Sequence, residues 1–298
     1  MRSAAWRAAG ALEVWYRDRF AGVVSPWPYA LFRIGIAVSI LVRTNDWLRP
    51  IFTLDHYAWV RGLEYDPQIE QVVSPALQSP LIPGLSIGPA LAAFLVRART
   101  SLAVVLLLGI KPRLTASILA LIGAALVAAD RYRYFHHLYL LWLSCAWLAI
   151  TPSSERLSLE RWVGRWPRAV SAPRWPLQIL RQQCIIVYLA SGVAKLNSDW
   201  LSGRTLSALE GLGLVRGALW HRGISLIGYS GAGTGIAVAE CALGPLLAWR
   251  RTRFWALGAG ALFHLAISAT MSVSIFSLLM ILYLATFLPF QECGVSSA

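Results

Sequence analysis

Lys195 is the residue whose type and position point most directly to chemistry. Only two of the 27 basic residues are lysines, and the other one, Lys111, lies in a turn before Pro112. Lys195 instead ends the apolar run 184–194. An ammonium group withdrawn from water can lose its proton and act as a base, whereas a guanidinium stays protonated. We therefore predict a catalytic base; the alternative is an amine that reaches the lipid headgroups or pairs with Asp199.

Three histidines lie within apolar segments. His136 and His137 begin one segment, and His264 lies in the middle of another. Neighbouring helical positions point about 100° apart, so the first two rings cannot readily share a metal ion, and we expect no metal site. We predict that His137 and His264 assist Lys195 in catalysis. The alternatives are an imidazole at the membrane interface for His137 and a helix–helix hydrogen bond for His264.

Glu240 is the only carboxylate well inside an apolar segment. A buried carboxylate needs a cation, a hydrogen bond or a proton. We predict a structural ion pair with Arg33, because an arginine fork can hold a carboxylate by two hydrogen bonds. Arg43 is the alternative counter-ion, and a role in a proton relay is the second interpretation.

The composition predicts a membrane protein. Hydrophobic residues make up 57% of the chain, charged residues 14%, and the mean hydropathy is +0.57, which is too apolar for an ordinary soluble domain. Fourteen tryptophans fit aromatic belts at two interfaces. The net charge of +13 comes from arginines placed between apolar runs, so we expect the lipid bilayer as partner and no nucleic acid.

Hydropathy predicts an all-α bundle of about eight transmembrane helices, because a span needs about 20 mostly apolar residues. The expected spans are approximately 28–47, 88–109, 113–130, 134–151, 176–196, 229–249, 253–270 and 272–290. The last two share one apolar stretch, so seven spans is the alternative. Residues 3–21 show helical spacing of apolar residues and are predicted to lie on the membrane surface.

The distribution of basic residues predicts the orientation. Most loop arginines fall in segments that would be cytoplasmic if the N-terminus is cytoplasmic. We therefore predict a multi-pass protein of the cell membrane with both termini inside. The expected organisation is an amphipathic segment 1–26, a membrane domain 27–290 and a tail 291–298. In this topology Lys195 and the pair His136 and His137 lie near the outer face.

The run 187–200, VYLASGVAKLNSDW, resembles a motif of the vitamin K-dependent gamma-carboxylase family. That family shares a membrane domain with many bacterial proteins, the horizontally transferred transmembrane (HTTM) domain. Three other stretches are similar to the same family and occur in the family order. They are Ala30–Ile34, His136–Leu140 and Phe263–His264 with the serines downstream.

The resemblance implies a cofactor and roles for several residues. The family lysine that matches Lys195 is understood to deprotonate reduced vitamin K, and quinol oxidation then yields the base that removes a glutamate γ-proton before carbon dioxide adds. The histidine that matches His137 is understood to assist. We accordingly expect a reduced, vitamin K-like quinone, with Tyr188 and His136 as its contacts.

The sequence ends at residue 298 without the large soluble domain of the carboxylase. We therefore expect a short secreted peptide as substrate, as for a small bacterial relative that matures a peptide of the sporulation-delaying toxin system. The expected function is an enzyme that couples quinol oxidation to peptide modification, such as glutamate carboxylation. The alternatives are a non-catalytic accessory or immunity factor for such a peptide, and a proton-coupled transporter that uses Glu240 and Lys195.

Overall fold

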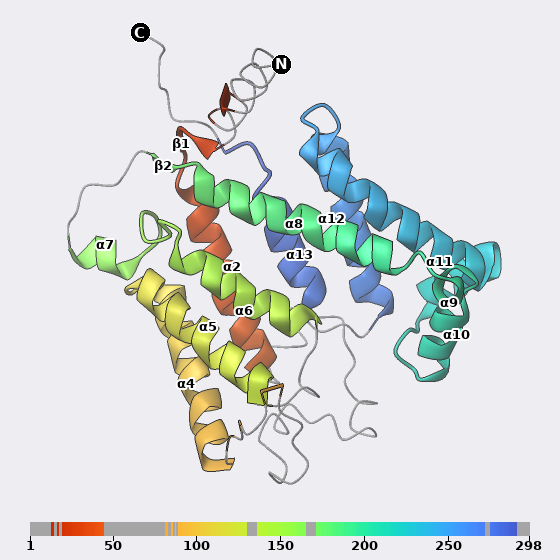
Figure 1. Cartoon of the computed structure of the whole chain (residues 1–298), viewed down its shortest axis with the longest axis horizontal. Coiled ribbons are helices and arrows are strands. Elements are labelled where there is room, and N and C mark those ends of the chain that lie inside the picture. The colour runs from red at the N-terminus through yellow and green to blue at the C-terminus, as the bar shows by residue number, and fades with distance from the viewer. Residues whose placement is uncertain are drawn as a thin grey trace, which may run out of the picture.

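The chain is mostly helical, as predicted from its hydropathy (Figure 1). The computed structural model describes residues 13–14, 17, 20–44, 81–82, 85, 87, 89–129, 136–164, 171–271 and 275–290. Within these ranges the only paired strands are the two-residue strands β1 (Val23–Val24) and β2 (Ala172–Pro173), which run antiparallel.

Each of the eight predicted apolar segments contains a helix in the described part of the chain. These helices are α2 (Trp27–Thr44), α4 (Pro89–Leu108), α5 (Pro112–Ala129), α6 (His136–Ala149), α8 (Trp175–Ala194), α11 (Ala218–Ala248), α12 (Arg253–Thr270) and α13 (Phe276–Ala285). The described connections between them also contain three short helices, α7 (Leu159–Val163), α9 (Ser198–Leu201) and α10 (Arg204–Gly211). The last apolar stretch is therefore two helices, as predicted.

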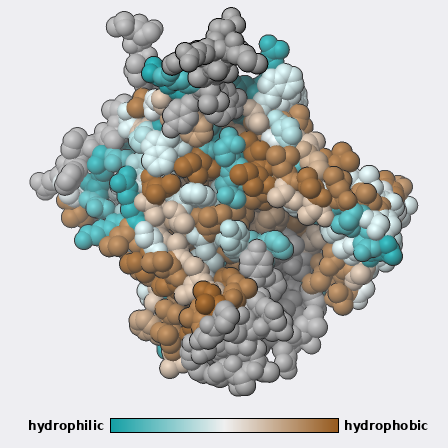
Figure 2. Space-filling view, in the orientation of Figure 1, coloured by the Kyte–Doolittle hydropathy of each residue, from teal (hydrophilic) through white to brown (hydrophobic). Residues whose placement is uncertain are grey.

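Three of the described helices, α5, α8 and α11, are long and apolar enough to cross a membrane. The face in Figure 2 carries broad apolar surface, with hydrophilic residues gathered near α7 and near α9 and α10. This pattern is that of a membrane protein. The eight-span topology and the orientation of the termini stay predictions.

The helix α11 begins earlier than predicted because it contains a kink. Gly228 has a φ of 68° and a ψ of 171°, a backbone conformation that glycine adopts most readily. The residues after the kink match the predicted span 229–249. The residues before it form a separate helical segment that lies beside α9 and α10 (Figure 1).

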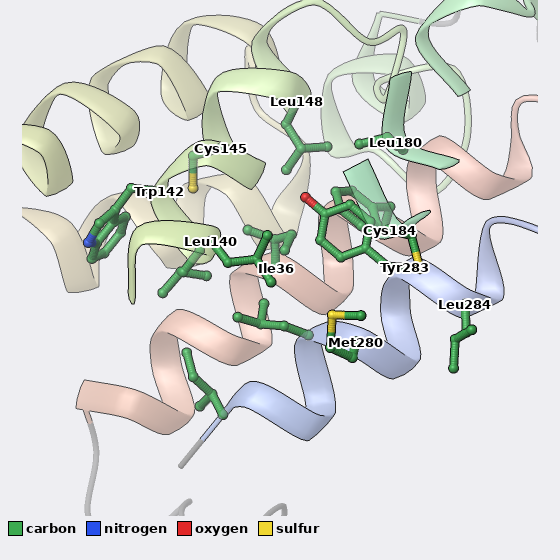
Figure 3. Packing of buried hydrophobic residues seen from close by; sticks show 14 of the residues in the cluster. Ile36, Leu140, Trp142, Cys145, Leu148, Leu180, Cys184, Met280, Tyr283 and Leu284 are labelled. Carbon is green, nitrogen blue, oxygen red and sulfur yellow. The ribbon is translucent and has the colours of Figure 1, made fainter. Parts of the chain in front are cut away.

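The main core lies where α2, α6, α8 and α13 meet (Figure 3). Tyr283 is fully buried there, its ring packs edge-on against Phe32, and its hydroxyl lies 2.7 Å from the hydroxyl of Ser144. Cys145 and Cys184 are buried in the same core as free thiols. This core fixes α8, the helix that carries the candidate site, against the rest of the bundle.

Several sequence predictions fall largely outside the described residues. The amphipathic helix 3–21 is one of them, although the described Glu13 and Arg17 form an ion pair four positions apart at 2.7 Å. The tail 291–298 is another. The boundaries at residues 26 and 290 stay predictions.

Candidate functional site

The amine of Lys195 lies between the end of α8 and the middle of α11. Lys195 caps the C-terminus of α8, and its Nζ donates to Oε2 of Glu240 at 2.5 Å. Nζ also donates to Ser191 Oγ at 2.6 Å and to the Ser191 carbonyl at 3.3 Å. The side chains of Lys195 and Glu240 are 19% and 7% exposed. The amine is therefore largely enclosed, but a charged partner accompanies it.

Ser191 closes a ring of three side chains. Its hydroxyl donates to Glu240 Oε2 at 3.0 Å while it accepts from Lys195. The indole ring of Trp200 lies 5.1 Å from Nζ, within the range of a cation–π contact. All three N–H directions of the ammonium thus have acceptors.

Small residues allow α8 and α11 to approach closely at this ring. A Cβ on Gly192 would lie 2.6 Å from the backbone nitrogen of Cys241, beside Glu240. One turn farther along α11, a Cβ on Gly244 would lie 2.9 Å from Leu189 Cγ. Close helix packing through glycine is a common device in membrane bundles. Here it brings the carboxylate of one helix within reach of the amine of the other.

The alternative pairing of Lys195 with Asp199 is wrong. Asp199 pairs with Arg204 at 2.5 Å, and both side chains are exposed. Asn197 caps α9 by accepting from the backbone nitrogen of Trp200 at 3.0 Å, and this cap turns the chain away from α8.

The predicted ion pair between Glu240 and Arg33 is also wrong. Arg33 is fully buried and donates to the carbonyl of Ser153 at 2.7 Å and to the carbonyl of Leu157. Its guanidinium therefore holds the segment after α6, whereas Glu240 faces the end of α8. Glu240 is paired with a cation, whereas Arg33 bonds to two backbone carbonyls, so both partners differ from those that the sequence suggested.

A second polar contact lies deeper along α8. The hydroxyl of Tyr188 and Nε2 of His264 on α12 are hydrogen-bonded at 2.8 Å, and both side chains are buried. Nδ1 of His264 has no hydrogen-bond partner among the described residues. The rings of Phe263 and Phe276 contact the imidazole edge-on. His264 thus makes the helix–helix hydrogen bond that was its alternative interpretation, and one of its nitrogens stays available.

The two polar contacts lie along one side of α8. Tyr188, Ser191 and Lys195 occupy positions i, i+3 and i+7, which share a helix face. Across from this face lie α11, with Glu240, and α12, with His264. The helix therefore presents one polar stripe that leads from its end into the bundle.

The pair His136 and His137 begins α6, as predicted. In Figure 1, α6 and α8 run in opposite directions, so the start of α6 and the end of α8 point toward the same side of the molecule. Within the described contacts, however, Lys195 bonds to Ser191 and Glu240 and to neither imidazole. The catalytic and cofactor roles of His137 and His136 stay predictions.

Sequence reasoning missed Ser191 as a member of the site. The signal was present, because Ser191 and Lys195 are four positions apart in one helical segment and such residues are neighbours on its surface. The transporter hypothesis had combined Glu240 with Lys195, but nothing in their spacing predicted contact.

A small lobe of α9, α10 and the first turns of α11 lies beside the site (Figure 1). We call it the α9–α10 lobe. Its apolar centre is Leu206, Val215 and Trp220. Glu210 accepts a hydrogen bond from Tyr229 at 2.6 Å, which lowers the pKa of that carboxyl, and it lies 3.1 Å from His221 Nδ1.

Comparison with protein-family models shows the family to which the chain belongs. The HTTM domain model matches residues 81–291, more than two thirds of the chain. The protein belongs to the HTTM domain family. The matched region holds Tyr188, Ser191, Lys195, Glu240 and His264. No solved structure matches the chain. The helix α2 precedes the matched region but packs against α13 within the HTTM domain, for example through Phe32 and Tyr283.

Proposed function

We propose that this HTTM protein is a membrane enzyme that couples quinol oxidation to the modification of a small secreted peptide, with Lys195 as the base. The observation that supports the proposal is the enclosed amine of Lys195, held between two apolar helices by Ser191 and Glu240. An ionisable residue at such a place in a membrane bundle usually serves a function. The motif around Lys195 also resembles the lysine motif of the carboxylases.

The buried pair of Tyr188 and His264 fits a quinone headgroup. Nδ1 of His264 is buried without a partner in the described structure, so a ligand oxygen would satisfy it. Phe263 and Phe276 supply the aromatic surroundings that a flat ring requires. A bound reduced quinone would supply two electrons to oxygen and, through that reaction, a base strong enough for a carbon acid.

The residues of the site have separate tasks in this proposal. In this proposal the ammonium of Lys195 first releases one proton to water, and the neutral amine then accepts a proton from a hydroxyl group of the reactant. A positioned base typically contributes about 10²–10⁴-fold to a rate. Ser191 orients the amine. The 19% exposure of the Lys195 side chain allows the proton to leave to water. Tyr188 and His264 hold the reactant by hydrogen bonds.

Mass spectrometry of secreted peptides is the decisive test. Cells with and without the gene would be compared, together with the variants Lys195→Arg and Lys111→Arg. Arginine keeps the positive charge but cannot supply a usable base. We expect the modified peptide to disappear in Lys195→Arg at normal protein levels and to persist in Lys111→Arg, the matched control. Unchanged product in both variants would contradict Lys195 as the base, and product that persists without the gene would contradict the enzyme and favour an accessory or immunity role.

A second assay tests the cofactor directly. Purified protein in lipid nanodiscs would receive a chemically reduced vitamin K-type quinone, and oxygen uptake would be followed above the spontaneous rate. We expect uptake that depends on Lys195. Oxygen uptake equal to that of empty nanodiscs, at every peptide concentration tried, would contradict quinol oxidation.

The contact between Lys195 and Glu240 also favours a second function, a proton-coupled transporter. Paired acidic and basic residues within a membrane bundle can relay protons. In proteoliposomes with an imposed proton gradient, a transporter would take up a solute, and Glu240→Gln would abolish the coupling. Solute uptake that is the same with and without the gradient would exclude this function.

We further propose the eight-span topology with both termini in the cytoplasm. Single cysteines placed at Ser171 and Asn197, in a variant without the native cysteines, would flank α8. We expect a membrane-impermeant thiol reagent to label only the second position in intact cells. Labelling of both positions would contradict a span by α8.

A further inference from the structure

We propose that Glu240 is the positioning residue of Lys195 and stabilises the ammonium that forms when the amine accepts a proton. The inference deepens the proposed function, because it rests on Lys195 acting as the base. It assigns to Glu240 a role that neither the family match nor the predicted pair with Arg33 suggested.

The geometry restricts the amine to one place. Lys195 Nζ and Ser191 Oγ both donate to the same oxygen of Glu240, Oε2, at 2.5 and 3.0 Å. Oε1 accepts no hydrogen bond from the residues that the structure describes. A lysine side chain has four rotatable bonds, and this double attachment selects one of its many conformations. The amine is thereby held over the face of α8 that continues to Tyr188.

Glu240 is the residue that compensates the charge of the Lys195 ammonium. The other titratable side chains on the helix faces that meet here are Tyr188 on α8, Cys241 beside Glu240 on α11 and His264 on α12, and none of them is a carboxylate. Asp199 is engaged by Arg204 at 2.5 Å. Among the described residues, Glu240 is thus the one carboxylate that bonds to Lys195.

The proton transfer has a clear balance. The O–H bond of the donor breaks, an N–H bond forms on Nζ, and the electron pair of the O–H bond stays on the oxygen. Without a carboxylate this step would create an isolated ammonium between two apolar helices, which is unfavourable. With Glu240 the product is an ion pair between two neighbouring side chains. A buried aspartate stabilises the imidazolium of serine proteases in the same way.

Nuclear magnetic resonance can follow this amine without any enzymatic assay. Because the chain has only two lysines, [ε-¹³C]lysine labelling gives two side-chain signals, and Lys111→Arg assigns them. We expect the titration midpoint of Lys195 to move to lower pH in Glu240→Gln, while Lys111 stays unchanged. Glu210→Gln is the matched control, since that carboxylate also accepts side-chain hydrogen bonds but lies in the α9–α10 lobe.

Two results would overturn the inference. One is an unchanged Lys195 midpoint in a folded Glu240→Gln protein. The other is an equal shift in the Glu210→Gln control. If Glu240→Gln does not fold, Glu240→Asp is measured instead, because it keeps the charge on a shorter side chain. Coupling between the two side chains then predicts a titration midpoint of Lys195 between that of wild type and that of a lysine without a carboxylate partner. A midpoint identical to wild type in Glu240→Asp would then count against it.

Measuring the peptide product separates this inference from the proposed function. Peptide product should fall about 10²-fold in Glu240→Gln, with the pH profile displaced to lower pH, and Glu240→Asp should restore part of it. If the wild-type protein forms no product, the proposed function fails while the titration still decides the role of Glu240. If product forms and its pH profile is the same in Glu240→Gln, the positioning role fails while the enzyme stands.

Discussion

The Nζ atom of Lys195 lies 2.5 Å from Oε2 of Glu240, although 45 positions separate the two residues in the chain. Their side chains are 19% and 7% exposed, so water compensates little for the loss of either partner. The pair therefore links the stability of the bundle to the chemistry of the site.

A double-mutant cycle should show this link. Lys195→Met or Glu240→Leu alone leaves an uncompensated charge and should lower the free energy of unfolding by about 3 kcal/mol. The double variant should recover most of this loss, because neither charge of the pair is left without its partner. Thermal unfolding in detergent measures all four proteins. Additive losses in the double variant would mean that the two residues do not interact.

Gly192→Ala should disturb the site without removing any of its polar groups. The new Cβ would lie 2.6 Å from the backbone nitrogen of Cys241, so α8 and α11 must separate. Such overpacking typically costs about 1–3 kcal/mol. Gly258→Ala is the matched control, because nothing lies within 4 Å of its Cβ position in α12. Equal thermal stability of the two variants would contradict the close approach of α8 and α11.

Arg33→Lys should destabilise the fold although the charge is kept. Lysine cannot reach both the Ser153 and Leu157 carbonyls as the planar guanidinium does. Losing one charged hydrogen bond at a buried site costs about 1.5–3 kcal/mol. Limited proteolysis between α6 and α7 would detect the released segment. Arg17→Lys, in an exposed ion pair, should leave the cleavage rate as it is in wild type.

Tyr188→Phe should weaken both the bundle and any ligand at His264. Nε2 of the buried imidazole loses its partner, which costs about 1–3 kcal/mol. Gly260→Ala would crowd the same region, because its Cβ would lie 3.2 Å from the Tyr188 hydroxyl and 3.1 Å from Leu284 Cδ1. Binding of a fluorescent quinone analogue, measured beside thermal stability, separates the two effects. Wild-type quinone affinity in Tyr188→Phe would exclude the proposed cofactor site.

The α9–α10 lobe should loosen in acid. The hydrogen bond from Tyr229 holds the pKa of the Glu210 carboxyl below its usual value. Its contribution to stability is therefore complete above the usual glutamate value and is lost as pH falls through the lower, folded value. Hydrogen exchange across 204–217 should accelerate over that range. Tyr229→Phe should exchange faster already at neutral pH and show less acceleration; an identical pH dependence would contradict this role.

The secondary structure could be predicted well because long apolar runs carry a strong signal. All eight predicted segments contain helices, and only α11 differs substantially in its start. Its early beginning depends on Gly228, where one glycine joins two helical segments. The sequence shows that glycine but cannot show whether the chain continues as a helix on both sides of it.

The amino-acid sequence by itself determined the helices, the membrane character and Lys195 as the residue to examine. Hydropathy and residue type are local properties, and they do not depend on how the helices pack. Only the tertiary structure decided that Glu240 meets Lys195 and Ser191, that Arg33 holds two carbonyls, and that Tyr188 meets His264. The choice of partner for a buried charge depends on which helix faces approach each other. Here that choice follows from the contact of Gly192 with α11, which no spacing along the chain encodes.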